Sequence, residues 1–140
     1  MATRKRTTIP DIQKMILDYL PNALASDIPE ELDGVSYVAV KPSDMGDKPY
    51  VLVLATGGPG VSNKIMYRAQ ITVDAYATTA YWAGVLARLV SSALHQLPLT
   101  EGPVAQVESP APAEFPDPDT DLARYTATFQ INTRLLGGDN

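Results

Sequence analysis

The sequence at positions 65–75 is Ile-Met-Tyr-Arg-Ala-Gln-Ile-Thr-Val-Asp-Ala, with an apolar or aromatic residue at every odd-numbered position. The even-numbered positions from Met66 to Tyr76 share the opposite face and are mostly polar. Successive side chains of a β-strand point to opposite faces of its sheet. This stretch therefore predicts a long strand with one face on a hydrophobic core and the other face turned away from it.

The residues that follow this strand change to helical spacing. Thr78 or Thr79 is a suitable N-cap, because a threonine hydroxyl can accept a hydrogen bond from a free amide of the first turn. Apolar residues then recur at intervals of three and four, which is typical of one face of an amphipathic helix. The members of this stripe are Trp82, Val85, Leu86, Leu89, Val90, Ala93, Leu94 and Leu97. Pro98 is expected to stop the helix, whereas Ala87 falls off the stripe.

A first helix is predicted near the N-terminus. Thr8 suits its cap, Pro10 its first turn, and Asp11 interacts favourably with the helix dipole. Apolar residues at positions 12–20 follow the helical spacing. Pro21 is expected to end or kink this helix, because proline lacks the backbone N–H that the helix needs.

Two short β-rich segments lie between this helix and the long strand. Gly34–Val40 and Tyr50–Ala55 are separated by polar turn residues, and this arrangement predicts a hairpin with a longer loop. The continuous apolar run at 50–54 is typical of an interior strand covered on both faces. The glycines at Gly57–Gly60 predict a flexible loop between strands.

The chain after the second helix predicts two further strands separated by a loop. Pro103–Ser109 has the character of a short strand, and apolar and polar residues alternate again at 123–135. Between them, residues 109–119 contain four prolines, which excludes a central strand or a helix and predicts an extended loop.

The element order is therefore α-β-β-β-α-β-β, and its short connections favour antiparallel pairing. We predict an α+β fold, a two-layer structure in which two helices pack on one face of a mostly antiparallel sheet of four to five strands. A length of 140 residues suits one domain. That domain is expected to span 9–136, between a flexible basic segment at 1–8 and a flexible end at 137–140.

Composition excludes several classes of protein. The chain has no cysteine, so disulfide frameworks, thiolate metal sites and thiol nucleophiles are excluded. It has a single histidine. Its net charge is −5 although Arg4, Lys5 and Arg6 stand together, so the rest of the chain is acidic and is expected to repel DNA phosphates. The sequence contains no apolar run of the roughly 18 residues that a membrane-spanning helix requires.

Three short motifs could carry chemistry, and each has a plainer interpretation. Gly57–Lys64 lacks the Gly-Lys-Ser/Thr ending of a phosphate-binding loop, and a strand rather than a helix follows it. Asp117–Asp121 resembles the start of a calcium loop, but Leu122 and Thr128 stand where glycine and glutamate are needed. His95 has no evident nucleophile or orienting acid. We therefore assign no catalytic, cofactor-binding or metal-binding residue and expect that the chain is not an enzyme.

The two alternating strands are longer than usual. Ile65–Ala75 and Ala123–Leu135 would reach roughly 35–45 Å, whereas a globule of this size is about 30–35 Å across. The strands are expected to bend at bulges or to project beyond the core, where a partner can cover their free edges. Side chains turned away from the core could be solvated or could meet a neighbouring subunit. The candidate subunit-interface residues are Arg68, Asp74, Tyr76, Arg124, Thr126 and Arg134.

In this order, the segments resemble tail terminator proteins of long-tailed phages, of the lambda-type tail terminator family and particularly of phages with actinobacterial hosts. The resemblance covers roughly residues 9–136. Its segments are the helix ending near Tyr19-Leu20-Pro21, Thr56-Gly57-Gly58, Ala69–Ala77 with the Trp82–Leu97 helix, and Phe115–Asp119 before Arg124–Phe129. The last of these blocks is its strongest part.

The resemblance implies a non-enzymatic virion protein that forms a ring, expected to be a hexamer, at the head-proximal end of the tail. Such a ring ends tube polymerisation and offers a surface for head–tail joining, so the implied partners are other copies, the tail-tube protein and head–tail connector proteins. Genomic DNA would pass through the ring without specific binding, and an acidic lumen would favour this. The implied location is the virion, and the host cytoplasm during assembly, without a membrane partner.

Two other readings of the sequence remain open. One is a head-completion, neck or tail-tube subunit, which is also structural. The other is a small ligand-binding module or enzyme that uses the Gly57–Gly60 loop, and a deep polar pocket beside that loop would favour it.

Overall fold

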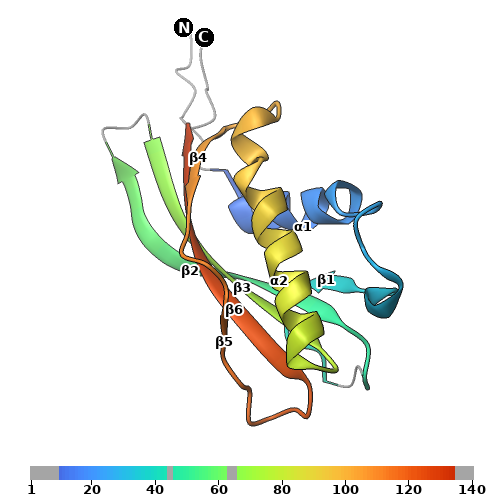
Figure 1. Cartoon of the computed structure of the whole chain (residues 1–140). Helices are drawn as coiled ribbons and strands as arrows, with labels where there is room; N and C mark the ends of the chain where they lie inside the picture. The colour runs from blue at the N-terminus through green and yellow to red at the C-terminus, as the bar shows by residue number, and fades with distance from the viewer. Residues whose placement is uncertain (1–9, 44–45, 63–65, 135–140) are drawn as a thin grey trace, which may run out of the picture.

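The computed structural model describes residues 10–43, 46–62 and 66–134, with the side chains of 59–62 left out. Six strands form one mostly antiparallel sheet, and two helices pack on one face of it (Figure 1). The elements are α1 (Ile12–Ala23), η1 (Glu30–Leu32), β1 (Ser36–Val38), β2 (Tyr50–Ser62), β3 (Met66–Ala77), α2 (Ala80–His95), η2 (Leu97–Leu99), β4 (Val104–Glu108), β5 (Ala113–Glu114) and β6 (Ala123–Arg134). The predicted α+β class is confirmed. The Thr8 cap and the two end segments at 1–8 and 137–140 lie outside the described residues.

The strand order is β1-β2-β3-β6-β4, and β5 pairs with β6 beside this path. The two long strands that the alternation predicted, β3 and β6, pair along their whole lengths, from Met66 opposite Arg134 to Ala77 opposite Ala123. Their core-facing side chains are buried as the alternation predicted, for example Ile71 and Phe129. A third long strand, β2, was predicted to end near Ala55 but continues to Ser62. The sheet thus has three strands of twelve or thirteen residues.

The predicted hairpin between the first two β segments is wrong. β1 runs parallel to β2, with Ser36 opposite Tyr50 and Val38 opposite Leu52. Because the two strands are parallel, the connection between them returns to the end of the sheet at which β1 begins. There the Ser36 N–H donates to the Pro49 carbonyl at 3.3 Å. Turn-rich residues between two β-rich segments fit a hairpin or a return connection, and only the pairing distinguishes them.

α1 is capped by Asp11 rather than by the predicted Thr8, and the Asp11 side chain accepts a hydrogen bond from the Lys14 N–H at 3.0 Å. The prediction that Pro21 ends the helix is wrong, because the helix continues through Pro21 to Ala23. A proline in the final turn removes a single helical donor, and the buried stripe Ile12–Leu20 holds the helix on the core.

α2 begins at the predicted Thr79 cap, whose hydroxyl accepts from the Trp82 N–H at 3.2 Å, and it ends before Pro98. Its buried face is rotated from the predicted stripe. Ala87 is buried, whereas the larger Trp82, Val85 and Leu89 are only half-buried. The small residues on this face let the helix approach the sheet closely. A Cβ on Gly84 would lie 3.1 Å from the Tyr125 ring.

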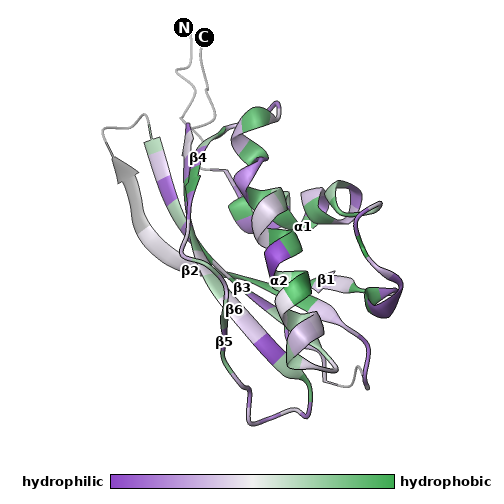
Figure 2. Ribbon diagram, viewed as in Figure 1, coloured by the Kyte–Doolittle hydropathy of each residue, from purple (hydrophilic) through white to green (hydrophobic). Residues whose placement is uncertain are grey.

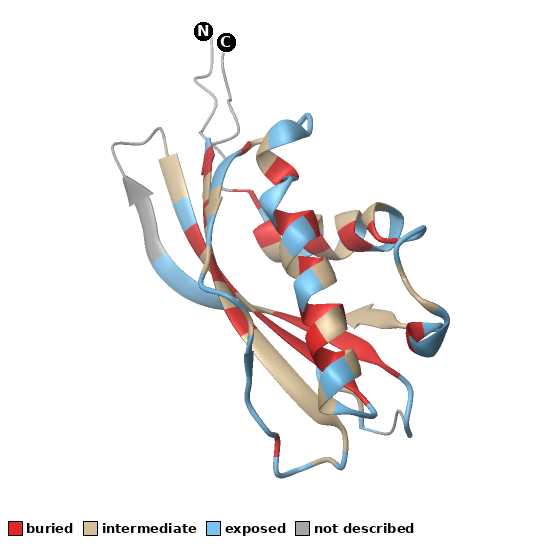
Figure 3. Cartoon of the chain, viewed as in Figure 1, coloured by how far each residue is buried: buried red, intermediate tan, exposed pale blue. Residues whose placement is uncertain are grey.

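Apolar residues concentrate where the two helices face the sheet, and the buried residues follow them (Figures 2 and 3). A second, smaller cluster of Tyr50, Leu52 and Tyr76 lies on the face without helices. The Tyr50 and Tyr76 rings are stacked, with their centroids 4.3 Å apart. Leu122 packs against this cluster and Asp117 accepts a hydrogen bond from the Tyr76 hydroxyl. The loop predicted from its prolines therefore packs against the sheet, and it contributes the two-residue edge strand β5.

Candidate subunit interface

The two ends of the sheet differ in how well they are covered. We call the end that holds Thr56–Ser62, Met66–Gln70, Val104–Glu108 and Gln130–Arg134 the open end of the sheet. Within the described residues, β1 pairs with β2 only at Tyr50–Leu52, so no strand covers the outer edge of β2 at the open end. The outer edge of β4 has no strand partner in the described ranges either. Unpaired N–H and C=O groups on a strand edge can be paired by another chain.

Two bulges bend β2 as it enters the open end. Between Ala55 and Gly57, and again between Gly57 and Gly60, β2 contains one residue more than the facing segment of β3. The β2–β3 end consequently curves away from the helices (Figure 1). Gly57–Gly60, predicted to be a flexible loop, is therefore part of a strand, and its glycines serve the bend.

The Gly58→Ala substitution is expected to loosen this bend. Gly58 has φ +110°, and a Cβ there would lie 2.8 Å from the Gln70 backbone nitrogen, so strain of about 1–3 kcal/mol is expected. Hydrogen exchange should become faster at Arg68 and Gln70 in the variant. Gly57→Ala is the matched control, because φ is +102° there but no atom lies within 4 Å. Equal exchange in the two variants would contradict this account of the bend.

The helix-free face of the open end is built mainly from hydroxyl and amide groups that bond across the strands. The hydroxyl oxygen of Thr72 lies 3.2 Å from those of both Thr56 and Thr128. The Gln130 Nε2 donates to the side-chain Oε1 of Gln70 at 3.1 Å, and the Asn132 Nδ2 donates to the side-chain Oε1 of Gln106 at 3.0 Å. These polar rows hold β2, β3, β6 and β4 in register and present a polar surface.

At the other end of the sheet, an ionic cluster ties the proline-rich loop to the helix-free face. We call Asp117 and its partners Lys41, Tyr76 and Arg124 the Asp117 clamp. Asp117 is 6% exposed, and its Oδ2 accepts from Lys41 Nζ at 2.6 Å and from the Tyr76 hydroxyl at 2.9 Å. The Asp119 N–H donates to its Oδ1 at 3.0 Å. The carboxylate thereby joins three separate segments of the chain.

Arg124 holds the loop from the side of β6. Its Nε donates to the Phe115 carbonyl at 2.7 Å, and its guanidinium carbon lies 4.6 Å from the centre of the Phe115 ring. Its Nη1 donates to the Tyr76 hydroxyl at 3.3 Å and lies 3.7 Å from Asp74 Oδ2. Arg124 therefore compensates the buried negative charge that Asp74 and Asp117 bring to this face.

The clamp perturbs the acidities of its members. The Lys41 ammonium, followed by the Asp119 N–H, holds the pKa of Asp117 well below its usual range. Burial, followed by the bond to Asp117, raises the pKa of Tyr76 well above the ordinary value. Asp117 is therefore ionised and Tyr76 protonated throughout the neutral range, which suits a fixed structural contact rather than proton transfer.

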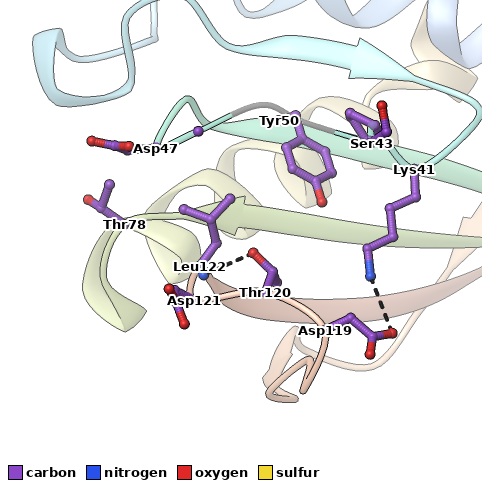
Figure 4. A pocket seen from close by; sticks show the side chains of 11 residues that line it. Lys41, Ser43, Asp47, Tyr50, Thr78, Asp119, Thr120, Asp121 and Leu122 are labelled. Carbon is purple, nitrogen blue, oxygen red and sulfur yellow. Dashed lines mark hydrogen bonds and ion pairs between the residues drawn. The ribbon is translucent and has the colours of Figure 1, made fainter.

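A cavity of about 520 Å³ lies next to the clamp, between the segment at 41–50 and the segment at 119–122. Lys41 reaches toward Asp119 at its rim, with Nζ 3.9 Å from Oδ2, and the Tyr50 ring faces the cavity from β2 (Figure 4). Its walls come from the two segments that the clamp joins, so its shape depends on the clamp. A smaller cavity of about 180 Å³ lies between Gln13 and Gly57, below the size typical of ligand pockets.

The structure separates the six candidate interface residues into two groups. Arg68 and Arg134 are exposed at the open end, on the helix-free face. Asp74, Tyr76 and Arg124 belong to the clamp and its surroundings, and Thr126 is half-buried opposite Ala113 of β5.

The expectation that Asp74 and Tyr76 are solvated or face a neighbouring subunit needs correction. Both turn away from the main core, as the alternation predicted, but they are only 7% and 1% exposed. Asp117 and Leu122 of the proline-rich loop contact Tyr76, and Arg124 of β6 lies against Asp74, all within the same chain. Strand alternation tells which face a side chain occupies, but not what covers that face.

Three residues of the Asp117 clamp and its surroundings were not named as candidates from the sequence. Lys41, Tyr50 and Asp117 contact residues far along the chain. Asp117 was considered as part of the proline-rich loop, of a calcium-like motif and of the Phe115–Asp119 block, but not as an interaction site. The signal for Asp117 was its place in a proline-rich loop directly before Arg124 and an alternating strand. Its carboxylate is engaged by Lys41 and Tyr76 rather than directed at a shared cation position.

His95 ends α2, where its Nε2 lies 2.8 Å from the Ser109 hydroxyl oxygen. This contact joins the helix to the start of the proline-rich loop. In the part of the chain that the structure describes, no group of three or more His, Asp or Glu side chains is arranged to hold a metal ion. No helix within the described ranges is long and apolar enough to cross a bilayer.

Comparison of the sequence with protein-family models and with curated proteins gives no match. Two features distinguish the part of the chain that the structure describes, a sheet end whose outer edges have no strand partner and an opposite end fastened by the Asp117 clamp.

Proposed function

We propose that the chain is a structural subunit that joins copies of itself in a ring, and that this ring is a phage tail terminator. The observation that carries the proposal is the open end of the sheet, where both outer edges lack a strand partner within the described residues. A sheet with two free edges has two different surfaces for a neighbour, and contacts between unlike surfaces generate rings or filaments.

The contrast between the two sheet ends supports the same proposal. At the clamp end, β1 pairs with β2, β5 pairs with β6, and Asp117 and Leu122 of the proline-rich loop contact the helix-free face. Exposed strand edges are an aggregation hazard that proteins usually blunt. At the clamp end the outer edges belong to β1 and β5, strands of three and two residues that offer a neighbour little backbone. The longer edge of β2 beyond Leu52 is therefore better suited to a specific partner.

The specific role follows from the resemblance of the sequence to tail terminators. In that role the ring, proposed to be a hexamer, caps the head-proximal end of the tail tube, stops its polymerisation and meets the head–tail connector. The protein would be in the host cytoplasm during assembly and then in the virion. DNA would pass a surface of hydroxyl and amide groups, of which Gln70, Thr72 and Gln130 are examples, together with the exposed Arg68 and Arg134. This face would not supply the acidic lumen that the sequence led us to expect.

A non-enzymatic role agrees with the chemistry of the Asp117 clamp. Asp117 and Tyr76 bond to each other, and the pKa values of both are displaced away from neutrality. Groups that serve as acids or bases in catalysis usually titrate near the working pH.

Free sheet edges would also serve a head-completion, neck or tail-tube subunit, so the position in the particle decides between these structural roles. Electron microscopy of tails purified without heads, with the chain labelled by an antibody, makes the distinction. A terminator is expected as one ring of label at a single tail end. Label along the tube would indicate a tube protein, label only on heads would indicate a neck protein, and absence from particles would refute a virion role.

A further inference from the structure

We propose that the ring contact is made by strand pairing, in which the outer edge of β4 in one copy pairs antiparallel with the outer edge of β2 in the next copy. This inference rests on the proposed function, since it names the surfaces by which the ring would close. It follows from the level, the direction and the composition of the two edges.

The two edges, which lack a strand partner among the described residues, lie at the same level of the sheet. Glu108 of β4 is opposite Gln130, which is opposite Gln70, which is opposite Gly57 of β2. By the same route through β6 and β3, Gln106 corresponds to Gly60. Copies related by rotation about a ring axis can therefore bring unlike edges together without one copy sliding far along the other.

Strand direction also fits. β2, β3, β6 and β4 are joined by three antiparallel pairings, so β4 runs opposite to β2. Placing β4 of one copy beside β2 of the next therefore continues the antiparallel alternation of the sheet. A sheet can close on itself in this way and lose its edges.

The composition of the edges allows a close approach. The free part of β2 from Leu54 to Gly58 contains no charged residue, and Glu108 is the single charged residue of β4. Pro59 has no N–H, so pairing on β2 is limited to the segments on either side of it. The exposed glycines at 57 and 58 remove side-chain obstruction where the neighbour would lie.

The arrangement has a consequence for the inside of the ring. The helices need more circumference than a single sheet layer, so they take the outer side and the helix-free face turns inward. A ring of six copies would contain four strands of each copy in this wall. The resulting wall of twenty-four strands is larger than the barrels of roughly 16–18 strands that already enclose an aqueous channel in porins.

Disulfide trapping tests the pairing, because the chain has no cysteine of its own. The variant carries Thr56→Cys in β2 together with Glu108→Cys in β4, two exposed positions at neighbouring levels of the helix-free face. A second variant with Thr56→Cys and Gln106→Cys allows for a small shift of register. Within one copy the two edges are three strand spacings apart, roughly 14 Å, which is too far for a disulfide.

Oxidation is carried out on purified protein at high concentration and on assembled particles. At least one double variant is expected to give covalent multimers up to the full ring. A mixture of Thr56→Cys protein with protein that carries only the matching β4 substitution is expected to give only dimers. Ser36→Cys with Glu108→Cys is the control, because Ser36 lies in β1 at the closed end and is expected to form no bond.

The possible failures are distinguishable. Rings that form without a disulfide in either double variant would overturn the strand pairing and leave the ring intact. Dimers of Thr56→Cys alone would replace it with a symmetric β2–β2 contact. If neither purified protein nor particles contain rings, the proposed function itself fails.

Discussion

The Asp117→Asn variant is expected to unfold at a lower urea concentration than the wild-type protein at pH 7. Asparagine preserves the size of the side chain but removes the charge that Lys41 and Arg124 face. Hydrogen bonds between charged groups contribute about 1.5–3 kcal/mol, and the lower half of that range is expected because Lys41 is partly exposed. Urea unfolding followed by the fluorescence of Trp82 measures the difference.

The same substitution is expected to reduce the pH dependence of stability. The pKa of Asp117 is lower in the folded protein than in the unfolded chain, so the unfolded chain takes up its proton first as the pH falls. The clamp therefore contributes its full stabilisation above the ordinary aspartate pKa near 4 and loses it progressively below that pH. The difference between wild-type and Asp117→Asn proteins should be constant from pH 5 to 7 and shrink toward pH 3.

Asp119→Asn provides the control for both measurements. Its side chain is 82% exposed and its carboxylate lies 3.9 Å from Lys41, while its backbone N–H would still donate to Asp117. A change of less than about 0.5 kcal/mol is expected, as for most exposed ion pairs. If both substitutions changed stability equally, the clamp would not be the fastening that we infer.

Leu86→Ala is expected to cost the most stability, about 2–5 kcal/mol. Leu86 is 0% exposed and lies on α2 where the helix faces the sheet, so the substitution leaves a cavity in the main core. Urea unfolding at a protein concentration low enough to avoid assembly gives the value. Leu89→Ala, one turn along the helix at a half-buried position, should cost less than half as much.

An equal cost at the two leucines would contradict the rotated buried face of α2. The comparison therefore also decides between the stripe predicted from the sequence and the observed one. The predicted stripe gave Leu89 the same weight as Leu86, because spacing alone does not distinguish the centre of a helix face from its flank.

Elements with strong local signals were predictable from the sequence. The alternation at 65–75 located β3 and its core face, and Thr79 was identified as a possible cap because capping depends on nearby residues. The prolines of 109–119 correctly excluded a central strand. These features are fixed by contacts within a few residues, so a single sequence can reveal them.

Features that depend on distant contacts were not predictable. The parallel pairing of β1 and β2 depends on where residues 39–49 lead the chain. The continuation of β2 through Gly57–Gly60 depends on its pairing with β3, which overrides the turn preference of glycine. Lys41 and Asp117 are separated by 76 positions, so nothing local linked them.

The positions of the candidate interface residues were predictable only in part, and their role in an interface stays a prediction. The length of the strands indicated free edges, and Arg68 and Arg134 do lie at the open end. Asp74 and Tyr76 instead fasten the closed end, because the chain covers its own sheet there. The protein combines an internally fastened half with an open half, and the second is the half that we assign to assembly.

The most direct test is cryo-electron microscopy of the head-proximal end of a tail that carries this chain. The account predicts a closed ring of copies in which density runs continuously from β4 of one copy to β2 of the next. Copies that contact one another only through their helices, or a tail end without this chain, would contradict it.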